Sequence, residues 1–208
     1  MISVDDTVLI LLAAGKSERM GDVGSKLEQP FLARPLGLHV AVALEDMPFR
    51  QRCVVVSETC TLDYAAHGFQ VLVNDDPSRD LSSSVRLGMR CALAHDPAAV
   101  MIALADMPRV TAAHIYRMLD AADSEGAVVA SSNGQHPTPP AIFGRAHFDT
   151  LMHVTGDEGA RDLIQAGRHV VTNAAELIDV DTPEELERLR ALVHAPEALS
   201  RPGTMRLL

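Results

Sequence analysis

One aliphatic run that stops in a small-residue turn constrains this chain more than any other feature. Residues from Val8 to Leu12 are all aliphatic, without the polar alternation of a strand that has one face in water. Such a run is typical of a strand covered on both faces in a parallel sheet. The turn that follows, Ala13-Ala14-Gly15, has almost no side chains, so its backbone N–H groups can approach an anion closely. We therefore expect a phosphate-holding loop at the carboxyl end of this strand, where such sheets bind ligands.

The turn does not match either of two well-known glycine-rich loops. A P-loop needs a glycine five residues ahead of its Gly-Lys-Ser, and that position holds Ile10. A dinucleotide-binding Gly-x-Gly-x-x-Gly needs a glycine where Ala13 stands. Positive charge still gathers after the turn, at Lys16, Arg19 and Lys26. These cations favour an anion-binding loop over a plain connection with solvated charges.

The composition predicts one α/β domain and excludes a broad nucleic-acid surface. A length of 208 residues suits a single domain, and 47% hydrophobic residues can form a sizeable core. The net charge is −10, aromatic residues make up 3% and Trp is absent, which disfavours both phosphate tracking and base stacking. We expect no nucleic-acid partner. A small anionic ligand is still compatible with the negative net charge, because its binding depends on the cations close to it. The domain should cover residues 1–194, and residues 195–208 read as a C-terminal tail.

The sequence carries no signal for a membrane or for secretion. No run approaches the roughly 20 apolar residues of a membrane span, and the first residues lack a charged-then-apolar pattern. Cys53, Cys60 and Cys91 are odd in number and form no Cys-x-x-Cys pair, which disfavours a disulfide framework or a structural zinc site. We therefore expect a cytoplasmic protein that has no membrane partner.

Strands and helices alternate along the chain, which predicts a mostly parallel, doubly wound sheet. We expect a helix that starts at Pro35, and an irregular loop over the polar, proline-rich residues 133–140. The other helices are expected at 81–94, from Thr111, at 145–153, up to Ala166 and from Thr182. The strands are expected at 53–57, 70–73, 100–104, 126–131, 141–143, 169–172 and 177–180.

Acidic residues follow two of the predicted strands. Asp106 comes directly after the run 100–104, and Pro108 then fixes the exit of the chain. A carboxylate in this place suits a divalent cation. The alternative is that Asp106 caps the next helix, but Thr111 is the better cap. Asp179 and Asp181 reach the same edge of the predicted sheet.

Three serines open the predicted helix at 81–94. Ser82, Ser83 and Ser84 are ordinary N-terminal residues, yet three in a row should leave one hydroxyl free for a ligand. Gly88 lies inside the helix, where glycine costs about 1 kcal/mol relative to alanine. We expect a ligand or another backbone to approach the helix closely at this position.

Taken together, the motifs resemble those of the MobA-like nucleotidyltransferases, and within them the molybdenum cofactor cytidylyltransferases. They stand in the family's order between Leu9 and Leu189. The matching stretches are Leu12-Ala13-Ala14-Gly15-x-Ser17-x-Arg19-Met20-Gly21 with Lys26-Leu27, Ser83-Ser84-Val85-x-Leu87-Gly88, Leu104-x-Asp106-Met107-Pro108, Gly156-Asp157-x-Gly159-Ala160-Arg161 and Asp179-x-Asp181-Thr182-Pro183-Glu184.

The resemblance implies a single-domain Rossmann-like α/β fold of the nucleotide-diphospho-sugar transferase type, with helices on both faces of a mostly parallel sheet. It also implies that CMP passes from CTP to the terminal phosphate of molybdopterin, with Mg²⁺ bound and pyrophosphate released. The implied catalytic residues are Arg19, Lys26 and Asp106, and the implied metal ligands are Asp106, Asp179 and Asp181. The implied nucleotide-binding residues are Leu12, Ala13, Ala14, Gly15, Ser17, Lys26, Ser83, Ser84 and Gly88, and the implied acceptor-binding residues are Gly156, Asp157, Gly159 and Arg161.

The nucleotide and the acceptor have alternatives. The family's cytidylyltransferases tend to have Ala-Ala-Gly, as at Gly15, where guanylyltransferases tend to have Ala-Gly-Gly, so CTP is favoured over GTP. The family's Gly-His-Pro is displaced here, because His136-Pro137 comes early and Pro139-Pro140 takes its place. Another phosphorylated acceptor therefore stays open. So does a carrier that delivers the molybdenum cofactor to a molybdenum hydroxylase without turnover.

Overall fold

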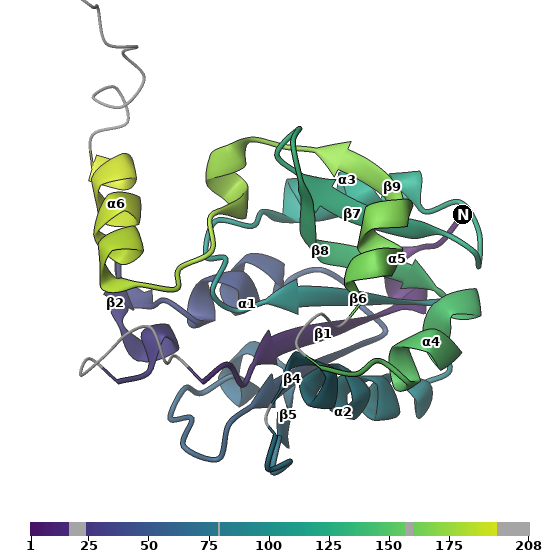
Figure 1. The fold of residues 1–208 in the computed structure, drawn as a ribbon, viewed down its shortest axis with the longest axis horizontal. Helices are drawn as coiled ribbons and strands as arrows, with labels where there is room; N and C mark the ends of the chain where they lie inside the picture. Colours follow the sequence, from purple (N-terminus) through teal and green to yellow (C-terminus); the bar gives the residue numbers. More distant parts are fainter. Residues whose placement is uncertain (17–23, 79, 157–159, 195–208) are drawn as a thin grey trace, which may run out of the picture.

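The core of the fold is a seven-stranded sheet that lies between two layers of helices (Figure 1). The computed structural model describes residues 1–16, 24–78, 80–156 and 160–194. The strand order is β5-β4-β1-β6-β8-β7-β9, and every pairing is parallel except the two made by β8. The strands are β1 (Thr7–Ala13), β4 (Gln51–Val56), β5 (Gln70–Val73), β6 (Ala99–Leu104), β7 (Val128–Ser132), β8 (Pro137–Gly144) and β9 (Arg168–Val171). This arrangement confirms the predicted α/β class.

Strand β1 is buried at all seven positions, as its uninterrupted aliphatic run predicts. It pairs in parallel with β4 on one side and β6 on the other. Leu12 lies level with Val55 of β4 and Leu104 of β6, so the three strands end at one edge. The small-residue turn and the turn that carries Asp106 therefore leave the sheet side by side.

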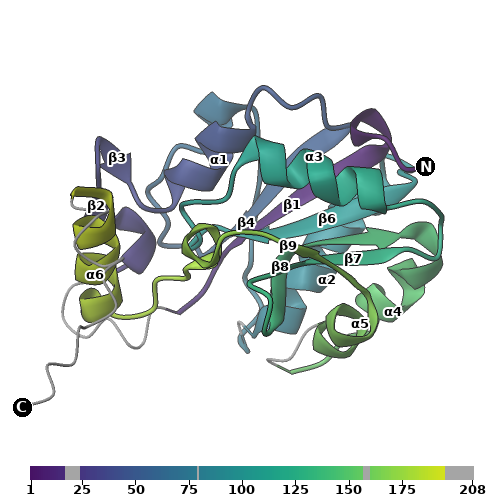
Figure 2. The ribbon, with the colours of Figure 1, turned by 90° about the horizontal axis from the view of Figure 1, so that it is seen from above.

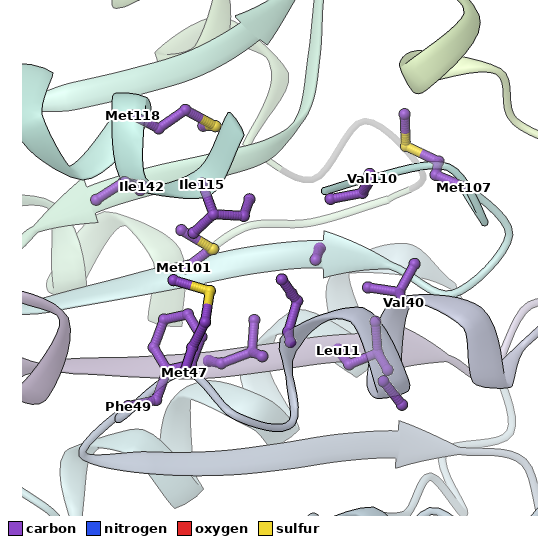
Figure 3. Close-up of a cluster of buried hydrophobic side chains, with 14 of the residues drawn as sticks. Leu11, Val40, Met47, Phe49, Met101, Met107, Val110, Ile115, Met118 and Ile142 are labelled. Atoms are coloured by element: carbon purple, nitrogen blue, oxygen red, sulfur yellow. The ribbon is translucent and has the colours of Figure 1, made fainter. Parts of the chain in front are cut away.

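Helices cover both faces of the sheet (Figure 2). Helices α1 (Leu38–Leu44) and α3 (Ala112–Ala121) pack on one face, where Met101, Ile115 and Ile142 lie in a common apolar cluster (Figure 3). Helices α2 (Leu81–Leu93), α4 (Phe148–Met152) and α5 (Arg161–Ala166) contribute to the cluster on the opposite face. The 3₁₀ helices are Val4–Asp6, Lys26–Glu28 (η3), Ala65–His67, Arg145–His147 and Ala174–Leu177 (η6).

Gly88 brings α2 into close contact with β1. A Cβ atom built on Gly88 would lie 2.4 Å from Cγ2 of Ile10, well inside van der Waals contact. The close approach predicted at this position is therefore made by a core side chain. Since packing accounts for the glycine, we leave Gly88 out of the nucleotide site.

Two predictions about the proline residues are wrong. Pro35 does not begin a helix, because β3 (Arg34–Pro35) pairs with β2 (Pro30–Phe31) and the helix starts at Leu38. The residues from Pro137 onward belong to β8 instead of an irregular loop. They lie beyond the last β6 pairing of β8, which is at Ala141, so this stretch has β7 alone as a partner. Prolines are tolerated there because a missing N–H costs no ladder bond on the open side.

A small satellite lies beside the end of the sheet, where α6 (Pro183–His194) packs with β2 and β3 (Figures 1 and 2). Its own core consists of Phe31, Leu36, Val180, Leu186 and Leu189. The segment before α6 is irregular after η6, so the strand predicted at 177–180 is wrong.

Thr182 caps α6 as predicted. Its hydroxyl accepts a hydrogen bond from the Glu185 N–H at 3.2 Å, and the Glu185 carboxylate accepts bonds from the N–H groups of Asp181 and Thr182. This capping box holds the backbone of Asp181 in place. The tail, residues 195–208, falls outside the described residues. Within the described ranges, no helix combines the length and the apolar character needed to cross a bilayer.

A buried polar network joins α3 to β7. His114 is fully buried, with Nε2 2.8 Å from the Ser131 hydroxyl and Nδ1 3.2 Å from a guanidinium nitrogen of Arg117. Since Arg117 can only donate, His114 is neutral and donates from Nε2 to Ser131. Burial lowers the pKa of His114, the charge of Arg117 lowers it further, and Glu176 opposes both.

We expect His114 to make the free energy of unfolding depend on pH. Its pKa is about 6.5 in the unfolded chain and lower in the folded protein, so the unfolded state binds the proton first. The stability contributed by neutral His114 is therefore present above pH 6.5 and is lost as the pH falls below it. Urea unfolding between pH 5 and pH 8 should show this loss. His114→Gln keeps a donor and an acceptor without titrating, and its profile should be flatter than that of the wild type; identical profiles would contradict the assignment.

Candidate active site

The site is built on the carboxyl ends of β1 and β6. The Ala105 N–H donates to the Leu12 carbonyl at 3.0 Å, which ties the two turns together beyond the sheet. Ala13 and Ala14 are buried, whereas a Cβ built on Gly15 would have no atom of the described residues within 4 Å apart from its chain neighbours. That this turn presents its backbone to a ligand stays a prediction.

Lys26 joins two acidic residues that are far apart in the sequence. Its ammonium group lies 2.6 Å from Oδ2 of Asp106 and 2.6 Å from Oδ1 of Asp181. The lysine side chain is only 9% exposed. Burial by itself would lower the pKa of Lys26, but the charges and hydrogen bonds of Asp106 and Asp181 outweigh it and raise the pKa. Lys26 is therefore a fully charged cation held between two carboxylates.

Asp106 has an unsatisfied carboxylate oxygen. While Oδ2 bonds to Lys26, Oδ1 is buried and has no hydrogen-bond partner. A buried acceptor without a partner costs about 1–3 kcal/mol, more when it is charged, so it marks a position where a ligand is expected. The Asp106 backbone is fixed, because its carbonyl accepts a 3.0 Å hydrogen bond from the N–H of Val180. A carboxylate with a free buried oxygen next to a second carboxylate fits a divalent cation.

The structure does not assemble the three predicted metal ligands as a set. Among the described residues, no three His, Cys, Asp or Glu side chains lie close enough together to hold a metal ion. Asp181 shares Lys26 with Asp106, whereas Asp179 does not take part in that ion pair. Partial burial raises the pKa of Asp179, and repulsion by Asp106 adds to the rise. The geometry thus favours Asp181 over Asp179 as the companion of Asp106.

The predicted serines lie at the start of α2 but are engaged within the protein. The hydroxyl of Ser82 donates to the Gly156 carbonyl, and the Nδ2 group of Asn74 donates to the hydroxyls of Ser83 and Ser84 at 2.9 and 3.0 Å. The cap of the helix is Asp80, whose carboxylate accepts from the Ser83 N–H at 2.6 Å. Each of the three hydroxyls therefore has at least one partner within the protein.

Asn74 is a residue that the sequence reasoning missed. Its side chain is buried, and its N–H donates to the carbonyl of Val56 at 2.8 Å, directly at the end of β4. It thus links the edge of the sheet to the first turn of α2 through Ser83 and Ser84. Its place directly after β5 is the signal that could have marked it, although β5 itself is mostly exposed.

A cavity of about 340 Å³ opens beside Leu12 and Leu104. Its walls are mostly aliphatic or aromatic, and four residues add polar groups: His136, Thr138, Arg161 and Gln165. Arg161 is the predicted acceptor residue that lines it. The other lining residues are Leu81, Val85, Ile102, Pro137, Pro139, Ala141, Phe143, Ala160 and Ile164, of which Ala160 belongs to the segment from Gly156 to Arg161 that is predicted to face the acceptor.

The remaining predicted residues divide into two groups. Gly156 is described; its φ is +71°, a conformation that favours glycine, and its carbonyl bonds to Ser82 at the start of α2. The other four, Ser17, Arg19, Asp157 and Gly159, lie outside the described residues.

The site as described combines a bare backbone turn, a buried cation, two carboxylates and an adjoining apolar cavity. Backbone N–H groups and a lysine can hold phosphate oxygens, and carboxylates can hold a cation that neutralises them. Such a set can position phosphoryl groups for transfer without any side-chain nucleophile.

Comparisons with known proteins agree with this chemistry. The family model of the MobA-like NTP transferase domain matches residues 9–172. The Purine catabolism protein PucB of Bacillus subtilis (strain 168) is 32% identical over 197 residues, which cover 87% of this chain and 94% of that protein. The Bifunctional protein GlmU of Sphingopyxis alaskensis is 31% identical over 144 residues, covering 67% of this chain but 31% of GlmU.

Solved structures share the fold. A homologue of Mycobacterium tuberculosis Rv0371c, from Mycobacterium sp. strain JC1, superposes with a TM-score of 0.74 at 26% identity, over 94% of this chain and all of that one. A nucleotidyl transferase from Methanothermobacter superposes with a TM-score of 0.73 over 92% of this chain and 99% of that one; at 19% identity it supports the fold alone. The family match covers well over half of the sequence, and it includes the small-residue turn, Lys26 and Asp106. The chain therefore belongs to the MobA-like NTP transferase family and is a nucleotidyltransferase.

Proposed function

We propose that this nucleotidyltransferase moves CMP from CTP to the terminal phosphate of molybdopterin and releases pyrophosphate, with Mg²⁺ as its cofactor. The observation that carries the proposal is the cluster of Lys26, Asp106 and Asp181 next to the open turn at Gly15. A cation and two carboxylates at one sheet edge fit a triphosphate and its metal ion. The Ala-Ala-Gly form of the turn supports CTP as the nucleotide.

Asp106 and Asp181 are the residues that would hold the metal. The buried, unpaired Oδ1 of Asp106 and the carboxylate of Asp181, on the other side of Lys26, supply the oxygen ligands that Mg²⁺ prefers. When bound, the ion would neutralise the charge of the phosphates during transfer. A structure of Rv0371c in complex with manganese, which superposes with a TM-score of 0.67 at 24% identity, supports a divalent ion.

The other residues bind and orient the substrates. The backbone of Ala13, Ala14 and Gly15 donates to phosphate or base oxygens, and Lys26 together with Arg19 holds the charge that develops on the leaving pyrophosphate. The attacking group is a phosphate oxygen that is already ionised at neutral pH. The protein therefore has to supply alignment and charge, and no general base is needed.

The cavity beside Leu104 supports an acceptor with a largely apolar body. Its walls are mainly hydrocarbon, and its polar groups are few, among them Arg161 and Gln165. A fused ring with polar edges would bury its faces against the aliphatic walls and keep its hydrogen bonds at those groups. A sugar phosphate would instead leave several hydroxyls without partners. The cavity therefore favours a pterin as the acceptor.

Turnover with defined substrates tests the proposal. The protein should release pyrophosphate when it is incubated with CTP, MgCl₂ and molybdopterin, at least tenfold faster than with GTP. Faster pyrophosphate release with GTP would overturn the assignment of CTP as the nucleotide. Release with N-acetylglucosamine 1-phosphate but not with molybdopterin would overturn the assignment of the acceptor. Tight CTP binding with pyrophosphate release at background level would support the carrier alternative.

Filling the cavity should weaken acceptor binding and leave nucleotide binding unchanged. Ala160 lines the cavity, is partly exposed and packs at the margin of the apolar cluster below α2, so Ala160→Leu adds bulk at the cavity wall. We expect the KM for molybdopterin to rise at least about tenfold, because the added side chain takes space that the acceptor needs. Ala174→Leu, at an exposed position that does not line the cavity, is the matched control. Equal KM values for both variants would show that the acceptor binds elsewhere.

A further inference from the structure

Two carboxylates of the candidate site form ion pairs with a lysine of the same chain. Lys26 places one ammonium group 2.6 Å from an oxygen of Asp106 and 2.6 Å from an oxygen of Asp181. Asp106 and Lys26 are 80 positions apart in the chain, and Asp181 and Lys26 are 155 apart. The ammonium thus neutralises two like charges that the fold brings to the same edge.

This neutralisation is incomplete. Oδ1 of Asp106 stays buried without a partner, although Oδ2 bonds to the ammonium. A divalent cation carries two positive charges, whereas the ammonium carries one. The free oxygen of Asp106 therefore leaves a ligand position for a divalent cation beside the carboxylates that Lys26 now contacts.

An ammonium group and a divalent cation cannot both sit between Asp106 and Asp181. They would carry three positive charges within a few ångströms, and like charges at such distances in a partly buried site repel strongly. The lysine has a long flexible stem and can move its charge by several ångströms. A metal ion that arrives must therefore displace it, and the displaced ammonium needs another anion as its partner.

We propose that Lys26 and the divalent metal compete for the Asp106–Asp181 pair, and that the phosphates of the nucleotide accept the displaced ammonium. The inference rests on the proposed function for the metal and the nucleotide, and goes beyond it in making Lys26 the link between them. Metal alone must break two short ion pairs, so it binds weakly. When the nucleotide is present, metal binding costs less free energy, because the displaced ammonium pairs with the phosphates in place of the carboxylates. By linkage, each ligand then strengthens the binding of the other by the same factor.

Mn²⁺ binding in the absence of any nucleotide tests the competition directly. The free ion is measured by electron paramagnetic resonance during titration of the wild type, Lys26→Met and Arg50→Met. Lys26→Met removes the competing charge and keeps a side chain of similar length, so it should bind Mn²⁺ at least tenfold more tightly than the wild type. Arg50→Met removes the same charge from the surface pair with Asp6, and its affinity should stay within twofold of the wild type.

Thermal unfolding gives a second readout that does not depend on activity. Without metal, Lys26→Met takes the ammonium away from two facing carboxylates and should melt below the wild type. Added Mn²⁺ should raise its melting temperature more than that of the wild type, because no ammonium has to be expelled. Lys26→Arg keeps the charge, so its Mn²⁺ affinity without nucleotide should remain as weak as in the wild type.

The outcomes separate this inference from the proposed function. Equal or weaker Mn²⁺ binding by Lys26→Met than by the wild type would overturn the competition and leave metal-dependent transfer standing. If the wild type and Lys26→Met both fail to bind Mn²⁺, with CTP or without it, then the metal site itself is refuted, and the competition with it.

Discussion

Asp106→Asn should lower the rate of pyrophosphate release at least about 100-fold, which is the scale of losing one charge-stabilising group in a transfer reaction. The side chain keeps its size but loses the charge that binds a cation. The buried Oδ1, which has no hydrogen-bond partner among the described residues, would no longer belong to a carboxylate. Steady-state kinetics with CTP, Mg²⁺ and acceptor measure the effect, and a rate within threefold of the wild type would refute the role of Asp106.

Two further variants serve as controls for this loss. Asp96→Asn removes the same charge from a surface pair with Arg145 and should leave the rate unchanged. Asp181→Asn should reduce the rate strongly, whereas Asp179→Asn should have a small effect, since Asp181 shares the ammonium of Lys26 with Asp106. The fold should survive in Asp106→Asn, because Lys26 keeps Asp181 as its counter-ion. Circular dichroism melting curves check this.

Gly144→Ala should reduce the free energy of unfolding by at least about 2 kcal/mol, in the range of other substitutions that overpack a buried position. A Cβ at this position would lie 2.3 Å from the carbonyl oxygen of Glu125 and 2.7 Å from its carbon. The carbonyl cannot easily move, because it accepts a 3.0 Å hydrogen bond from the Ala146 N–H. Gly144 itself donates to the Ala127 carbonyl at 2.8 Å, which holds the two segments together.

Gly126, which lies next to Glu125 in the segment before β7, offers a matched control. A Cβ built on Gly126 would have no atom within 4 Å, so Gly126→Ala should change the free energy of unfolding by no more than about 0.5 kcal/mol. Urea unfolding of both variants and the wild type, at one pH, gives the comparison. Equal midpoints for Gly126→Ala and Gly144→Ala would mean that the close approach to Glu125 does not constrain the protein.

The features that could be predicted from the sequence are those set by a few neighbouring residues. The aliphatic run at Val8–Leu12 predicts a doubly covered strand, and Thr182 followed by Pro183 predicts the start of α6; both are confirmed. The proline-rich part of β8 was wrongly predicted as a loop. Prolines fit a strand only where one side has no neighbouring strand, and the number of neighbours is not known from the sequence. That number depends on where β6 ends, which lies outside any local window.

The candidate site shows the same division. The motifs place Asp106 and Asp181 at the edge of the sheet, but the ammonium of Lys26 between them is a long-range arrangement that spacing does not predict. The cavity could not be predicted from the sequence either, since its wall combines β8 and α5 with the end of β1, which are far apart in the chain. Asn74 was missed because a single asparagine after a strand is common. Its meaning appears only when it is seen bonded to Ser83 and Ser84.

The satellite formed by α6, β2 and β3 means that the candidate site is completed late in the synthesis of the chain. Asp181 lies in this late segment, past the end of the family match at residue 172, and its neighbour Val180 packs with Phe31 and Leu36. A ribosome therefore releases the turn at Gly15, Lys26 and Asp106 long before it adds the second carboxylate. During this interval the ammonium of Lys26 has Asp106 alone of the two as its partner. A nascent chain should thus hold the turn, the lysine and the first carboxylate before its site is complete, and the segment that carries Asp181 completes the carboxylate pair.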